Sequence, residues 1–174
     1  MRKNTILRIA LIGLMAAMLE CGKLVLAVLP NIEVVTLLCA LFGYVFGGAG
    51  VVATIVFIAI EPLIYGFGTW MISYCLYWPL VTIIFMLLGR AKVRNRVILT
   101  VIAVILTVWF GVLSSLVDTG LFSGYLDNFF SRFSIIYLRG ISFYVTQILC
   151  NAVLFPLLFR TLSELLIKLK KRMI

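Results

Sequence analysis

Six apolar segments fill this 174-residue chain, and most of its positive charge lies in the short stretches that bound them. Twelve of the fifteen lysines and arginines fall in residues 2–8, in the loop 90–96 or in the tail 160–172. If the chain crosses a bilayer six times, all three basic stretches reach one side, which the positive-inside rule makes the cytoplasmic side. The sequence therefore predicts an all-α integral membrane protein, a compact bundle of six transmembrane helices with the N and C termini cytoplasmic.

The composition supports a membrane protein and leaves no room for a soluble domain. Apolar residues make up 64% of the chain and charged residues 12%, whereas soluble domains have roughly 45–50% and about 25%. Six spans of about 20 residues each leave only short loops. Residues 1–174 are thus expected to form a single domain with a short basic tail over 161–174. The net charge of +9 flanks the spans, which favours contact with the lipid bilayer and no nucleic acid.

Turn residues between the apolar runs divide the chain into its expected helices. These helices cover residues 7–28, 33–47, 50–66, 69–89, 97–117 and 134–159. The second and third are short, so five spans are the main alternative, although five spans would put the termini on opposite sides. The tail after residue 159 has leucines at helical spacing beside its cations, so it either lies on the inner membrane surface or extends the last helix.

Four ionisable residues lie inside the expected spans, where such residues are rare, costly and usually functional. They are Glu20, Lys23, Glu61 and Arg139. With both termini inside, all four fall in the outer halves of their helices, Arg139 about 7–8 Å below the outer end. Their shared depth predicts a polar pocket open to the outside. Mutual salt bridges that only hold the bundle together are the structural alternative.

Aromatic and amide side chains occur at the same expected depth. Trp70 and Trp78 belong to a run of aromatic residues at helical spacing, and Trp78 would lie about 13 Å deep, too far in for an interfacial belt. On the last span, a polar stripe along one face is formed by Tyr137, Gly140, Tyr144, Gln147 and Asn151. Such a stripe is costly in lipid, so it is expected to face the interior, either in the pocket or in hydrogen bonds between helices.

Small residues mark the inner half of the first span. Gly13 and Ala17 are four residues apart, with Ala10 and Ala16 beside them, and such spacing allows another helix to approach closely. A second pair of this kind is Gly43-x-x-x-Gly47. Packing inside the bundle is the alternative explanation for both.

Several chemistries lack the residues they need. The chain has no histidine, which removes metalloprotease, di-iron and b-type haem sites, and its four cysteines are widely spaced in apolar runs. We expect no metal and no cofactor. The sequence contains no G-x-x-x-x-G-K-[ST] phosphate loop, so ATP hydrolysis by that route would need another chain.

These features together resemble a family. A chain of this length with six spans, both termini inside, a small-x-x-x-small motif on the first span and a Leu-Pro-Asn turn before the second is similar to the substrate-binding S components of energy-coupling-factor (ECF) transporters. The stretch LPNIEVVTLL is particularly similar to S components from Gram-positive bacteria. The resemblance covers the whole chain and implies a multi-pass protein of the bacterial cell (plasma) membrane.

The resemblance also implies partners and a mechanism. S components capture a vitamin or related micronutrient from outside, and they work with a transmembrane coupling protein and two cytoplasmic ATPases. The alanine-rich face of the first helix docks on the coupling protein. Carried over, Gly13 and Ala17 hold the motif positions, with glycine in place of the usual first alanine. The family's pocket lies toward the outside and is capped by outer loops, here including the loop that contains Asn31.

The function favoured on these grounds is a binding subunit, and not an enzyme, that captures a vitamin-like small molecule. Lys23 or Arg139 would meet a carboxylate or phosphate of the ligand, and Glu20 or Glu61 a cationic or hydroxyl group. The alternatives are a self-sufficient small transporter or channel, and an intramembrane enzyme that uses Ser114 or Ser115 with Lys23. The expected substrate-binding residues are Glu20, Lys23, Asn31, Glu61, Trp70, Tyr74, Trp78, Tyr137, Arg139, Tyr144 and Gln147; the expected docking residues are Ala10, Gly13, Ala16 and Ala17.

Overall fold

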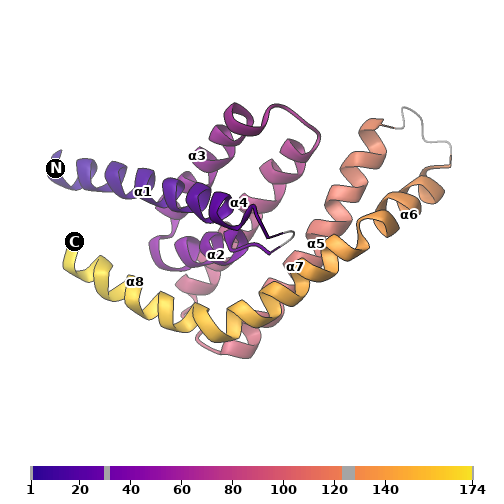
Figure 1. Ribbon diagram of the computed structural model, residues 1–174. Helices are drawn as coiled ribbons and strands as arrows, with labels where there is room; N and C mark the ends of the chain where they lie inside the picture. The colour runs from indigo at the N-terminus through magenta and orange to yellow at the C-terminus, as the bar shows by residue number, and fades with distance from the viewer. Residues whose placement is uncertain (1, 30–31, 123–127, 174) are drawn as a thin grey trace.

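The computed structural model describes residues 2–29, 32–122 and 128–173, and within these ranges all the regular structure is helical (Figure 1). In chain order the elements are α1 (Arg2–Leu26), α2 (Val35–Phe46), α3 (Gly48–Tyr65), α4 (Trp70–Arg90), α5 (Arg96–Phe122), α6 (Phe129–Arg139), α7 (Ile141–Leu154), η1 (Phe155–Phe159) and α8 (Arg160–Met173). Successive long helices run back and forth, and the two ends of the chain lie on the same side of the view (Figure 1).

Five of the described helices are long and apolar enough to cross a membrane. They cover Thr5–Leu26, Gly48–Tyr65, Trp70–Arg90, Arg96–Leu121 and Ile141–Arg172. This confirms a multi-pass helical membrane protein. The expected second span is shorter: α2 has 12 residues, which gives a length of about 18 Å against a hydrocarbon core of about 30 Å. The six-span count and the cytoplasmic termini stay predictions.

The expected last span, 134–159, differs most from its prediction. The structure divides it at Gly140 into α6 and α7. A side chain at position 140 would come within 2.7 Å of the Tyr144 ring, so glycine allows this close approach. The helix then continues through the π turn η1, which contains Pro156, into α8. Proline and π turns are the usual causes of a change in helix direction. The tail therefore continues the last helix with a change of direction, and its position at the inner membrane surface stays a prediction.

Close backbone contact joins α2 to α4, the most extensive pair of helices in the bundle. A Cβ added at Gly43 would lie 2.1 Å from the Thr82 carbonyl oxygen, and one added at Gly89 would lie 2.3 Å from that of Tyr44. Only glycine permits helix axes to come so near. Gly43 thus serves packing inside the bundle, as the structural alternative proposed, whereas Gly47 ends α2 with a positive φ of 61°.

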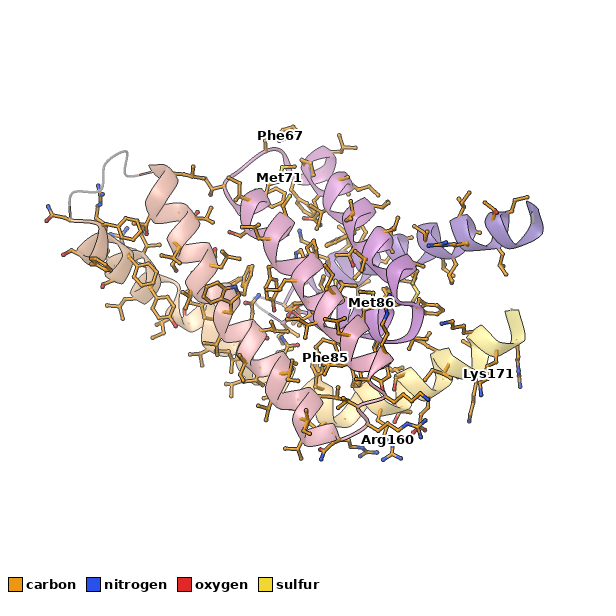
Figure 2. All side chains as sticks on the ribbon, turned by 180° about the vertical axis from the view of Figure 1, so that it is seen from behind. Phe67, Met71, Phe85, Met86, Arg160 and Lys171 are labelled. Carbon is orange, nitrogen blue, oxygen red and sulfur yellow. The ribbon has the colours of Figure 1, made fainter. Side chains whose placement is uncertain are left out.

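Two of the basic stretches meet at one end of the molecule. The Tyr44 hydroxyl donates to the carbonyl of Val93 in the α4–α5 loop, and the Lys170 ammonium of α8 donates to the carbonyl of Val45 (2.8 and 2.7 Å). Figure 2 shows Arg160 and Lys171 at this end and Phe67, in the α3–α4 turn, at the other. We call them the basic end and the Phe67 end. Aromatic packing of Phe85 closes the core near the basic end.

Candidate functional site

A cavity of about 220 Å³ lies where the end of α1 and the start of α2 face α3, α4, α5 and α7. It is on the side of the bundle toward the Phe67 end, because its walls include the last residue of α3 and the first turns of α4. Its aliphatic wall comes mainly from the α1–α2 connection. The polar and aromatic residues that line it are Lys23, Glu33, Phe57, Tyr65, Tyr74, Trp78, Phe110, Phe143 and Gln147.

The short α2 explains why a cavity can form here. Because α2 is too short to cross the hydrocarbon core, the chain before it is irregular at a level where its neighbours are still helical. Irregular backbone at membrane depth is tolerated only where protein buries it or where it lines a polar cavity. Leu29, Ile32 and Glu33 of this connection all line the cavity.

A charged cluster on α1 and α3 forms one side of the cavity. The Lys23 ammonium makes a hydrogen-bonded ion pair with the Glu61 carboxylate, whose side chain is completely buried. Glu20, one turn before Lys23 and also buried, interacts electrostatically with both. Helical spacing puts residues 20 and 23 on one face of α1, toward α3. Two carboxyl groups thus surround one ammonium group.

Three aromatic rings lie close to the Lys23 head group. The Lys23 nitrogen lies 4.1 Å from the ring centroid of Tyr65, 5.1 Å from that of Tyr74 and 5.7 Å from that of Trp70. An ammonium over an aromatic face within about 6 Å is attracted by the ring's quadrupole. Trp70 and Tyr74 also pack edge to face, with centroids 5.1 Å apart, which fixes both rings.

Glu33 lies on the α2 side of the cavity and has only neutral hydrogen-bond partners among the described residues. Its carboxylate accepts from the Thr36 backbone N–H at 3.0 Å and from the Thr36 hydroxyl at 2.5 Å. The Asn151 amide of α7 donates to it at 3.0 Å and also to the Thr107 hydroxyl of α5. Glu33 therefore caps the first turn of α2 and joins it to α5 and α7.

Two polar groups that line the cavity have no partner among the described residues. Trp78 is 4% exposed and Gln147 is 7% exposed. The indole N–H of Trp78 has no acceptor, and the amide oxygen of Gln147 has no donor. A buried polar group without a partner costs roughly 1–3 kcal/mol. Both groups are available to a bound molecule, the first as a donor and the second as an acceptor.

The structure brings most of the predicted site residues together. Lys23, Tyr74, Trp78 and Gln147 line the cavity. The others that reach it do so through Lys23. Glu61 is paired with its ammonium, Glu20 interacts with the same charge, and Trp70 contributes a ring to its aromatic surroundings.

Three predicted residues lie elsewhere, and one falls outside the described residues. Arg139 is exposed at the end of α6 and has no ion pair with any described residue. The prediction that Arg139 joins Glu20, Lys23 and Glu61 in one group of charges is therefore wrong. Tyr137 packs on Tyr144, with centroids 5.4 Å apart, and does not line the cavity. Tyr144 is buried, with its hydroxyl 2.9 Å from that of Ser115. Asn31 lies in the undescribed pair 30–31.

The position of Arg139 has a simple geometrical cause. The interior stripe of α7 follows Gly140, Tyr144 and Gln147, at intervals of three and four residues. Successive residues on a helix are about 100° apart, so Arg139 is turned away from this stripe. The spacing alone could have separated Arg139 from Tyr144, which is five residues or about 140° further round the helix, because equal depth does not place two residues on one face.

Several cavity residues were not predicted. Glu33 lies two residues before the start of α2. An acidic residue at this position is ordinarily attributed to a favourable interaction with the helix dipole, so it does not by itself indicate a binding site. Tyr65, Phe110 and Phe143 are aromatic residues in apolar runs and have no sequence signal that separates them from core or lipid-facing positions. Their contribution depends on which helices meet at the cavity.

The small residues of α1 divide into two groups. Ala10, Gly13 and Ala17 are exposed along one face of the helix, and nothing lies within 4 Å of a Cβ added at Gly13. Ala16 is 2% exposed and packs inside the bundle, so it cannot take part in docking as predicted. The first turns of α1 and the last turns of α8 project from the bundle on the same side in both views (Figures 1 and 2).

Two larger hollows lie at the basic end, with volumes of about 320 and 590 Å³. They share Tyr44, Arg94 and Lys171, and most of their polar walls are exposed lysine and arginine side chains. A hollow between mobile charged side chains at a helix end is expected of a surface in contact with water and anionic headgroups. The smaller cavity is the better candidate site because its unpartnered polar groups are buried.

Two residues of the enzyme alternative, Lys23 and Ser115, have other partners. Lys23 is paired with Glu61, and Ser115 lies against the Tyr144 hydroxyl. Activation of a serine by lysine requires direct hydrogen bonding between them.

Comparison of the chain with protein-family models, with curated proteins and with solved structures gives no match. Inference about function therefore starts from the cavity, the charges around it and the exposed face of α1.

Proposed function

We propose that this chain is the membrane-embedded, high-affinity binding subunit of an ATP-driven micronutrient importer in a bacterial plasma membrane. The observation that carries the proposal is the cavity of about 220 Å³, which combines charged groups, aromatic rings and unpartnered buried polar atoms. Ligand sites are concave and mostly apolar, with a few convergent polar groups that fix orientation. The importer function and the partner proteins in this proposal are inferred from the resemblance of the sequence to S components of ECF transporters.

The ligand in this proposal is a vitamin-like molecule that enters from the Phe67 end. The aromatic residues Tyr74, Trp78 and Phe110 lie close together, with Tyr74 and Trp78 centroids 5.6 Å apart and Tyr74 and Phe110 centroids 6.4 Å apart. Rings at these spacings offer flat surfaces to a ring-containing ligand. Trp78 and Gln147 provide a hydrogen-bond donor and an acceptor that fix its orientation.

Docking on a coupling protein is assigned to the exposed small face of α1, formed by Ala10, Gly13 and Ala17. Small side chains allow a partner helix to approach closely in lipid, where association depends on van der Waals packing. This face is directed away from α3, against which the opposite face of α1 packs. The same helix therefore carries a binding residue, Lys23, and the proposed docking face.

Copurification tests the proposal most directly. A tagged chain is isolated under mild detergent from the membranes of its own source cells, and its companions and small molecules are identified by mass spectrometry. We expect a transmembrane coupling protein, two ATPases and a bound small molecule. The Gly13→Trp variant is the matched control, and it should retain the small molecule while losing the proteins. A chain that purifies alone and transports by itself in liposomes would support the self-sufficient transporter instead.

A further inference from the structure

We propose that the cavity selects a compact organic cation, a single-ring molecule that bears an ammonium or another positively charged nitrogen. This inference rests on the proposed function and adds the class of substrate to it. It also revises the sequence-based expectation that Lys23 or Arg139 receives a ligand carboxylate or phosphate. The grounds are the charge balance of the cavity, the partners of Glu33 and Lys23, the aromatic walls and the unpartnered groups.

The charge balance around the cavity is negative. Glu33 lines it, and Glu20 and Glu61 lie directly behind Lys23, which is the only basic residue among the described residues that line it. The undescribed segments 30–31 and 123–127 contain no lysine or arginine in the sequence. Three carboxyl groups thus face one ammonium group. Even if Glu20 and Glu61 share a proton, the negative charge is in excess.

Lys23 is poorly placed to bind an anion. Its charge is already neutralised by Glu61, with Glu20 nearby, and aromatic rings lie over part of its head group. An incoming carboxylate would have to displace a buried carboxylate, which would then lose its counter-ion.

Glu33 is available to a cation. Its hydrogen-bond partners are a backbone N–H, a hydroxyl and an amide, all of them neutral. The N-terminus of α2 offsets roughly half a charge at most. Glu33 is half-buried, and a carboxylate that is partly removed from water and lacks a full counter-charge attracts a cation that can reach it. A ligand ammonium at Glu33 would form a charge-assisted hydrogen bond.

The cavity walls suit a cationic ring. Trp78 and Tyr74 line it next to Phe110 and Phe143, and indole is the side chain with the strongest cation–π attraction. The cavity volume of about 220 Å³ exceeds the roughly 150 Å³ that holds benzene. One ring with a short substituent therefore fits.

The unpartnered groups are an independent indication of a ligand. Gln147 and Trp78 are more than nine-tenths buried and line the cavity, and the amide oxygen of the first and the indole N–H of the second have no partner among the described residues. A cation with an N–H group satisfies the Gln147 oxygen, and a second polar atom on the ligand satisfies the Trp78 N–H.

Three probes of the same size test the charge preference: phenylethylammonium, neutral 2-phenylethanol and anionic phenylacetate. Each is titrated against the purified full chain in detergent while its thermal unfolding is followed, because a ligand of the folded state raises the unfolding temperature. We expect phenylethylammonium to stabilise the wild type most. Glu33→Gln keeps an acceptor oxygen for the cap of α2 but removes the charge, and it should weaken this binding by about tenfold or more. Glu164→Gln, which removes an exposed carboxylate at the basic end, should change nothing.

The outcomes separate this inference from the function it builds on. Equal or stronger stabilisation by phenylacetate, unchanged cation binding in Glu33→Gln, or no stabilisation by the cation overturns the charge assignment. Copurification of the coupling protein and ATPases would still support the importer in each case. If Glu33→Gln does not fold, Trp78→Leu replaces it. That variant keeps the carboxylate but loses the ring, and it should reduce the preference for the cation over the alcohol; an unchanged preference counts against the proposal.

Discussion

Lys23 shows most clearly how one residue in this chain combines structure with recognition. It is 26% exposed, whereas its partner Glu61 is fully buried. The lysine therefore makes the burial of two carboxyl groups tolerable while its head group forms part of the cavity wall. Such a residue contributes to folding whether or not a ligand is present, and the two roles can be measured separately.

At the residue scale, we predict that Lys23→Met destabilises the folded chain by about 3 kcal/mol, because Glu61 and Glu20 are left buried without a cation. The double variant Lys23→Met/Glu61→Gln should recover a large part of this loss. Chemical unfolding in detergent of the wild type, both single variants and the double variant gives the interaction energy. If the double variant is as unstable as the sum of the single variants, the pair has no energetic coupling.

A second prediction at this scale concerns Gly43. A Cβ at this position would lie 2.1 Å from the Thr82 carbonyl oxygen, so Gly43→Ala must force α2 and α4 apart. We expect a loss of roughly 1–3 kcal/mol in unfolding free energy, the usual cost of overpacking. Gly48→Ala is the control, because nothing lies within 4 Å of a Cβ added there. Equal stability of the two variants would show that the α2–α4 contact adapts at no cost.

At the scale of elements, the two faces of α1 have different roles. One face packs on α3 and contributes Glu20 and Lys23 to the charged cluster. The other presents exposed small residues over a length of helix that extends beyond the bundle (Figure 1). α2 contributes to the cavity through its length and its first turn. Because α2 is short, the irregular chain before it lines the cavity, and the Thr36 N–H of its first turn donates to the Glu33 carboxylate.

The separation of faces on α1 predicts that Gly13→Trp abolishes ligand uptake by cells but leaves ligand binding by the purified chain unchanged. The indole has free space in the isolated chain and would block only a helix that docks there. Uptake and binding of the copurified ligand are measured in parallel. Ile105→Trp is the matched control on α5, where the native side chain is 61% exposed. Loss of binding in Gly13→Trp, or loss of uptake in Ile105→Trp, would contradict the docking role.

At the scale of the whole molecule, charge and apolar surface are arranged by end. The basic stretches 90–96 and 160–171 contact each other at one end through Tyr44, Val45 and their partners. The acidic and aromatic residues of the cavity lie on the side toward the Phe67 end. If the basic end is cytoplasmic, the cavity opens toward the outside, which an importer requires.

This arrangement predicts the sidedness of two exposed positions. In a background without the four native cysteines, Phe67→Cys should react with a membrane-impermeant thiol reagent added to intact cells. Lys92→Cys should react only after the cells are permeabilised, because its loop is basic and expected inside. Labelling of Lys92→Cys in intact cells would reverse the topology and place the cavity on the cytoplasmic side.

Much of the cavity could be predicted from the sequence because membrane burial is so costly for charge. Glu20, Lys23 and Glu61 are conspicuous in apolar segments, and the periodicity of the last helix correctly put Gln147 on an interior face. Depth was a sufficient guide for α1 and α3, which are neighbours in the bundle. It was not sufficient for Arg139, whose helix face is directed away from the cavity.

The sequence by itself determined that this protein is a bundle of apolar helices, which charges must be accommodated within it, and where the cations gather. These properties follow from the composition and spacing of single segments, since the cost of placing a charge in lipid does not depend on neighbours far along the chain. Only the tertiary structure decided that Glu33 meets Asn151, 118 residues away, and that Ala16 packs inside while Ala17 stays exposed. Contacts of this kind depend on how helices cross and where they bend, as at Gly140, and many side chains together set that geometry.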